Sequence, residues 1–288
     1  MKPRSRSVTG ADGIGVHVLD WGGEGVPLLL LHGFGNEAHI WDDFAPAVAP
    51  HYHTLAMDHR GHGDSDWDPE RRYAHEHMVA DVEAVTAALG IDRLVVIGHS
   101  LGGRVATLFA DRNPARMAGL VLVDIGPDLD PRGVTRIRID MESNRQPTFG
   151  SVEEYARVLS LAYPSGQPAA LMRMALHGLR RRDDGRYALK MDPLLRGGGP
   201  REAPEVAEER GRAMSETLWK ALAGISCPTL VVRGAASDVL SPETADKMVE
   251  ETLPNGRLAI VPQAGHSVMT DNPDGFRKAI TDFILADE

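Results

Sequence analysis

The sequence predicts a doubly wound α/β fold, in which helices cover both faces of a mostly parallel sheet. Short, fully apolar runs such as 27–31 and 120–123 have the composition of strands that are buried on both faces. Stretches with apolar residues at helical spacing alternate with these runs. This alternation is typical of parallel strands joined by right-handed helical crossovers.

The first half of the chain shows this alternation most clearly. After a basic tail at 1–9, which we expect to be loose, residues 14–21 alternate apolar with polar and predict an antiparallel strand. Buried strands are then expected at 27–31, 52–57, 95–97 and 120–123. Helices are expected between them, and Gly90 and Pro114 mark two of the helix ends.

The pattern changes after residue 127. From 128 to 221 no buried strand is expected, and several amphipathic helical patches predict an inserted helical cap, or lid. The alternation resumes with strands at 229–232 and 258–261 and a final helix after Pro273. We therefore expect a core of about eight strands made from residues 1–127 and 222–288, with the cap inserted at 128–221.

Composition narrows the class of protein. The chain has 288 residues and a formal net charge of −10, which argues against nucleic acid or an anionic membrane as a partner. Its one cysteine, Cys227, excludes an intramolecular disulfide and fits a reducing compartment. With no run of about 18 apolar residues, the sequence predicts a soluble, cytoplasmic protein. It leaves the oligomeric state open.

A candidate nucleophile stands where the strand at 95–97 meets the next helix. The pattern Gly98-His99-Ser100-Leu101-Gly102 has the spacing of a nucleophile elbow, a tight turn that lifts the serine hydroxyl above the sheet. The start of a helix also favours the negative charge that develops during attack on a carbonyl.

A serine hydroxyl needs a base, usually a histidine that a carboxylate holds in one tautomer. His266 follows the last strand and Asp238 follows the strand before it. The carboxyl ends of parallel strands share one edge of the sheet, so Ser100, Asp238 and His266 can converge there. Asp124 also ends a core strand and is the alternative acid.

Together these motifs resemble the α/β-hydrolase superfamily, in the branch with a His-Gly-x loop, a Gly-His-Ser-x-Gly-Gly elbow and a helical cap. The resemblance extends over nearly the whole chain and is weakest in the cap. It implies an oxyanion hole formed by the backbone N–H groups of Phe34 and Leu101. It also favours Asp238 as the acid, because the commoner arrangement places the carboxylate after the penultimate strand.

The predicted function is that of a serine hydrolase. Similar dehalogenases and epoxide hydrolases carry an aspartate at the elbow, so Ser100 favours a small-molecule ester, thioester or lactone cleaved through an acyl-enzyme. The alternatives are a C–C bond hydrolase, a cofactor-free perhydrolase resembling haloperoxidases, and a ligand receptor with a vestigial triad. Trp41 and Met269 are expected on the pocket wall.

No cofactor and no metal site is predicted. Histidines are frequent between residues 51 and 77, but no aspartate, glutamate or cysteine accompanies them at the spacing of a known ligand motif.

Overall fold

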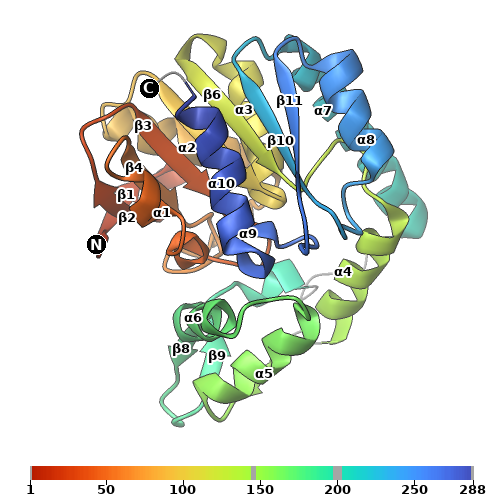
Figure 1. The fold of residues 1–288 in the computed structure, drawn as a ribbon. Helices are drawn as coiled ribbons and strands as arrows, with labels where there is room; N and C mark the ends of the chain where they lie inside the picture. The colour runs from red at the N-terminus through yellow and green to blue at the C-terminus, as the bar shows by residue number, and fades with distance from the viewer. Residues whose placement is uncertain (1, 144–146, 197–202, 287–288) are drawn as a thin grey trace.

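The computed structural model describes residues 2–143, 147–196 and 203–286, and its central feature is one mostly parallel sheet (Figure 1). In this described part of the chain the sheet has eight strands in the order β1-β2-β4-β3-β5-β6-β10-β11. Only the pairs β1–β2 and β2–β4 are antiparallel. The α/β class predicted from the sequence is confirmed. The strands are β1 (Arg4–Thr9), β2 (Gly15–Gly22), β3 (Pro27–Leu31), β4 (His53–Met57), β5 (Leu94–His99), β6 (Met117–Val123), β10 (Thr229–Gly234) and β11 (Gly256–Val261).

The N-terminal segment corrects one expectation. Residues 1–9 were expected to be loose, but β1 pairs along its whole length with β2, from Arg4 opposite Asp20 to Thr9 opposite Gly15. Arg6 also donates a hydrogen bond to Asp20 at 2.9 Å. A mostly exposed edge strand lacks the apolar pattern of a buried one, so its composition reads as a tail.

Helices cover both faces of the sheet and bury two separate apolar clusters. Side chains from α2, α3 and the end of α7 pack on one face, and those from α1, η2 and α10 pack on the other. The core helices are η1 (Ala11–Gly13), η2 (Ala38–Trp41), α1 (Ala45–Val48), α2 (His75–Ala88), α3 (Leu101–Arg112), η3 (Pro114–Arg116), α8 (Pro242–Lys247), η5 (Met248–Thr252), α9 (Val268–Asp271) and α10 (Pro273–Ile284).

The segment between β6 and β10 lies over the carboxyl end of the sheet, as Figure 1 shows. Besides helices it contains a small antiparallel sheet in the order β7-β9-β8, which the sequence did not predict. Its elements are α4 (Pro131–Ser143), β7 (Thr148–Phe149), α5 (Val152–Ala162), α6 (Pro168–Gly178), β8 (Leu179–Arg181), β9 (Tyr187–Leu189), η4 (Pro193–Arg196) and α7 (Pro204–Gly224). We call residues 131–196 the cap segment.

The expected end of the insertion, at residue 221, falls inside α7. This helix continues to Gly224, and its last turns pack against α3. Leu218 and Leu222 are almost completely buried there. The last turns of α7 therefore pack as part of the core, although the helix follows the cap segment in the sequence.

Candidate active site

Ser100 stands at a sharp turn between β5 and α3. Its backbone has φ 52° and ψ −114°, a conformation that a residue with a side chain adopts only where its surroundings impose it. A Cβ on Gly98 would lie 2.4 Å from the carbonyl oxygen of Gly102, and one on Gly102 would lie 2.3 Å from that of Leu31. The two glycines are therefore what lets the strand and the helix approach closely enough to form the elbow.

Three side chains form a continuous hydrogen-bonded chain. His266 Nδ1 lies 2.9 Å from Asp124 Oδ2, and His266 Nε2 lies 3.0 Å from Ser100 Oγ. A carboxylate only accepts hydrogen bonds, so Nδ1 carries the proton and Nε2 can accept the one from Ser100. This is the arrangement of a nucleophile, a base and an orienting acid.

The preference for Asp238 as the partner of His266 is wrong, and the alternative, Asp124, takes that position. Both Asp238 carboxylate oxygens are held by the Arg136 guanidinium, at 2.7 and 2.8 Å. Hydrogen bonding to Arg136 lowers the pKa of Asp238 below its ordinary value. Asp238 therefore joins the cap segment to the core, and it is Asp124 that occupies the Nδ1 edge of the imidazole.

Asp124 is fully buried and accepts three hydrogen bonds. Besides His266, it accepts from the backbone N–H of Gly234 at 3.0 Å and from Ser237 Oγ at 2.5 Å. The Ser237 hydroxyl accepts in turn from two backbone N–H groups that follow it in the chain. Ser237 was missed from the sequence, where its only signal is a small hydroxyl residue in the loop after a predicted core strand.

The loop that carries His266 is fixed from two sides. His99 donates from Nε2 to the His266 carbonyl oxygen at 2.9 Å, and Asp271 accepts from the Gly265 N–H at 2.8 Å. Burial, together with the neighbouring His266, lowers the pKa of His99 to about 3. His99 is therefore neutral at physiological pH and adds no second charge beside the base.

The oxyanion donors expected from the resemblance lie beside the elbow. Phe34 belongs to the loop after β3 and borders the same cavity as Ser100, and Leu101 is the first residue of α3. Within the described part of the chain, neither backbone N–H donates to another residue. Gly33 brings the two segments together, since a Cβ there would lie 3.2 Å from the Ser100 Cβ. The two N–H groups are thus available to an oxygen near Ser100.

A cavity of about 680 Å³ lies between Ser100 and the cap segment. This volume is in the range of small-molecule sites. Trp41 and Met269, expected on its wall, are instead buried in the core on one face of the sheet, where Trp41 packs against Phe276. They are directed away from the cavity because η2 and α9 turn their apolar faces to the sheet. Among the described residues, the cap contributes mainly Ile137, Tyr155, Leu159, Tyr163 and Arg196 to the wall.

The fold and this site define an α/β hydrolase, and the comparison with known families agrees. The family model described as "alpha/beta hydrolase fold" matches residues 26–273. The chain belongs to this family of hydrolytic enzymes.

Several known proteins are similar over almost the whole chain. The crystal structure of an α/β hydrolase from Novosphingobium aromaticivorans is 31% identical, with a TM-score of 0.82 over 99% of this chain and 98% of that one. N-formylmaleamate deformylase of Pseudomonas putida is 27% identical over 95% of this chain and 94% of its own. An esterase of Mycobacterium tuberculosis is 27% identical over 90% of this chain and 82% of its own.

None of the described helices is long and apolar enough to cross a membrane.

Proposed function

We propose that this chain is a serine hydrolase that cleaves a carboxylic ester, thioester or lactone through an acyl-enzyme on Ser100. The observation that carries the proposal is the hydrogen-bonded chain from Ser100 through His266 to Asp124, which borders the cavity below the cap segment. Similarity to an esterase agrees with this reaction class. The site uses side chains of this chain alone, and we propose that it needs no cofactor.

The proposed reaction has two halves. Ser100 Oγ attacks the carbonyl carbon while its proton moves to His266 Nε2, and Asp124 stabilises the imidazolium that forms. The N–H groups of Phe34 and Leu101 stabilise the oxyanion, after which His266 gives its proton to the departing alcohol, thiol or ring oxygen. In the second half, water loses a proton to His266, attacks the acyl carbon and releases the acid.

The charges on the cavity wall favour a substrate that is neutral near the reacting carbonyl. Arg136 is paired with Asp238 through both of its hydrogen bonds to that carboxylate. Arg196 on the cap side and Asp271 on the core side also border the cavity, and burial raises the pKa of Asp271. Apolar cap residues between them offer contact to an acyl chain of small or medium size.

We propose that the cap segment selects the substrate and excludes water from the cavity. Support comes from the position of α5, whose residues Tyr155 and Leu159 border the cavity opposite Ser100. The Arg136–Asp238 pair holds the cap segment to the core at the cavity wall.

The test is a panel of p-nitrophenyl esters of increasing acyl length, thioesters and lactones, together with labelling by a fluorophosphonate. We expect multiple turnover on esters and labelling that Ser100→Ala abolishes. Ser165→Ala is the matched control, since this serine borders the same cavity without contacting the triad. Labelling of Ser100 without turnover of any substrate would contradict the proposal and favour a receptor.

Cleavage of an activated amide is the second candidate function. It is favoured by similarity to a deformylase whose name specifies an N-formyl maleamate, together with Arg196 on the cavity wall, where a cation can contact a carboxylate. Comparing kcat/KM for neutral esters with that for N-formyl amides bearing a carboxylate separates the candidates. If Arg196→Met lowers only the amide rate, the amide is the better assignment.

A further inference from the structure

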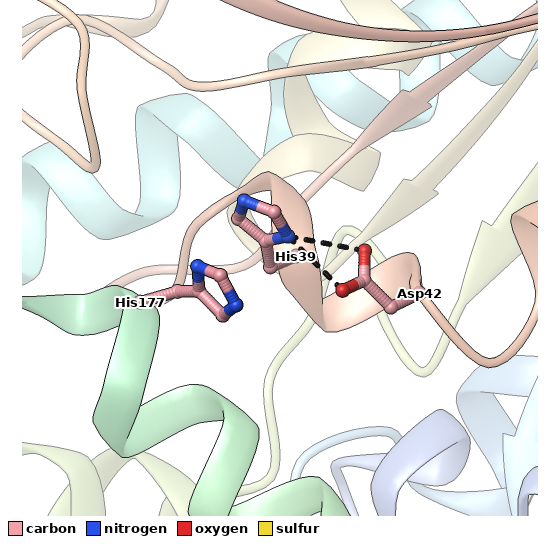
Figure 2. Close-up of side chains that lie close together, drawn as sticks. All are labelled: His39, Asp42 and His177. Atoms are coloured by element: carbon pink, nitrogen blue, oxygen red, sulfur yellow. Dashed lines mark hydrogen bonds and ion pairs between the residues drawn. The ribbon is translucent and has the colours of Figure 1, made fainter. Parts of the chain in front are cut away.

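Three potential metal ligands meet where the cap segment contacts the core, outside the catalytic cavity. His39 and Asp42 come from the region of η2, and His177 comes from the last turn of α6 (Figure 2). Each residue offers a ligand atom that lies within 4.8 Å of the other two. His39 and His177 are 138 positions apart in the chain, so this cluster exists only when the cap segment is docked on the core.

From this geometry we propose that His39, Asp42 and His177 form a binding site for a divalent transition metal ion that joins the cap segment to the core. Two imidazoles and one carboxylate are a donor set that suits Zn²⁺, Co²⁺ or Ni²⁺. A fourth position remains for water. In a tetrahedral zinc site the ligand atoms are about 3.4 Å apart, so these side chains, whose ligand atoms lie within 4.8 Å of one another, have to rotate to close on the ion.

The two imidazoles lie face to face. Their rings stack with centroids 3.5 Å apart and an angle of 18° between the planes. Because the lone pair of a ring nitrogen lies in the plane of its ring, one ring has to rotate out of the stack before both rings can bind the same ion. Within the described residues, neither ring nitrogen of His177 has a hydrogen-bond partner. The His177 ring can therefore turn toward an ion without giving up a hydrogen bond to another described residue.

His39 and Asp42 occupy the other side of the site. His39 Nδ1 lies 3.0 and 3.2 Å from the two carboxylate oxygens of Asp42, as the dashed lines in Figure 2 show. For Nδ1 to bind the ion, the neutral His39 ring has to carry its proton on Nε2, and the ion then takes the place of the proton between Nδ1 and the Asp42 carboxylate. The side chains of His39 and Asp42 are 18% and 23% exposed, so an ion can reach them.

Neighbouring charges at the same contact are nearly balanced. Arg173 on α6 forms an ion pair with Asp43, and Lys190 forms one with Asp64 at 2.7 Å. The two cations are therefore already paired with carboxylates. Asp42 remains as the acidic group that faces the imidazoles, and it offsets part of the charge of the ion.

A metal ion at this site would link the segment that follows Phe34 to α6 of the cap segment. His39 lies five residues after Phe34, in the segment that continues the proposed oxyanion loop. A metal ion held by His39 and His177 ties this segment to α6, so opening the cap would require loss of at least one ligand. Metal binding is therefore expected to protect α6 from hydrogen exchange.

Titration of the whole chain with Co²⁺ tests the site, because tetrahedral Co²⁺ has an intense visible absorption. We expect one ion to bind, and His39→Gln and His177→Gln each to weaken binding by at least about tenfold. His51→Gln, an exposed histidine away from the cluster, is the matched control and should bind like the wild type. Asp42→Asn is a second variant that leaves both rings in place, and thermal melting checks that every variant folds.

Hydrogen exchange with and without the ion tests the link between cap and core. Added protection of α6 in the wild type, absent in His177→Gln, supports the proposal. The catalytic His266 is the competing ligand, so His266→Gln is measured as well and is expected to keep the site. If His266→Gln abolishes binding while His177→Gln does not, or if the wild type binds no ion, the proposal is wrong.

Discussion

Replacing each of the two candidate acids separately tests the geometry of the triad. In Asp124→Asn, the amide that faces His266 can no longer hold Nδ1 as the donor, so the imidazole takes the wrong tautomer for accepting the Ser100 proton. The loss expected from such a change is about 10⁴-fold in kcat, which corresponds to about 5 kcal/mol of transition-state stabilisation. In Asp238→Asn, the ion pair with Arg136 is weakened. Their side chains are 31% and 38% exposed, and such pairs contribute about 0.2–1 kcal/mol, at most about fivefold in rate.

The assay is kcat and kcat/KM on the best p-nitrophenyl ester, with fluorophosphonate labelling as a measure of Ser100 reactivity alone. Circular dichroism and thermal melting show whether each variant folds, since Asp124 also holds Gly234 and Ser237. An Asp124→Asn variant within tenfold of the wild type, alongside an Asp238→Asn variant that loses 10³-fold or more, would refute the reasoning.

Three further outcomes follow from the structure. Ser237→Ala removes a donor to the buried Asp124 carboxylate and should lower kcat about 10–100-fold with little change in KM; an unchanged kcat in steady-state assays would exclude a positioning role. Gly102→Ala places a Cβ against the Leu31 carbonyl and should reduce the free energy of unfolding by about 1–3 kcal/mol and abolish labelling, whereas Gly211→Ala, with open space around it, should not. Three fully buried histidines have pKa values lowered by burial to about 3 or 4, below the value of about 6.5 in the unfolded chain. These are His59, His62 and His99. Since the unfolded chain takes up these protons first, stability should fall as pH drops below about 6.5, by about 2 kcal/mol per histidine at pH 5. Urea unfolding that gives equal stability at pH 7.5 and pH 5 would contradict this.

The fold and the sharp turn at Ser100 could be predicted because their signals are local. Apolar runs such as 120–123 specify buried strands through composition alone, and the glycines around Ser100 are demanded by backbone contacts of less than 3 Å. His266 follows from the shared carboxyl edge of a parallel sheet. These features depend on residues that are close in sequence, or on a rule that holds for every parallel sheet.

The acid and the cavity wall could not be predicted in the same way. Asp124 and Asp238 both follow core strands, and the choice between them depends on which carboxylate turns inward. That direction is fixed by contacts between residues far apart in the sequence. Arg136, from the cap segment, donates to the Asp238 carboxylate, and the Gly234 N–H donates to the Asp124 carboxylate. Trp41 was misplaced for a related reason, since sequence alone does not show which face of η2 meets the sheet.

The contact between Ser237 and Asp124 brings the ends of β10 and β6 to the same edge of one imidazole. The Ser237 hydroxyl lies 2.5 Å from the carboxylate oxygen that holds His266, so two loops present oxygen atoms at nearly the same point. The imidazole needs a negatively charged acceptor there, whichever strand supplies it. Either strand end could therefore supply that carboxylate. If Asp124 and Ser237 exchanged side chains, the acid would move from the end of β6 to the end of β10, while Ser100 and His266 would keep their positions.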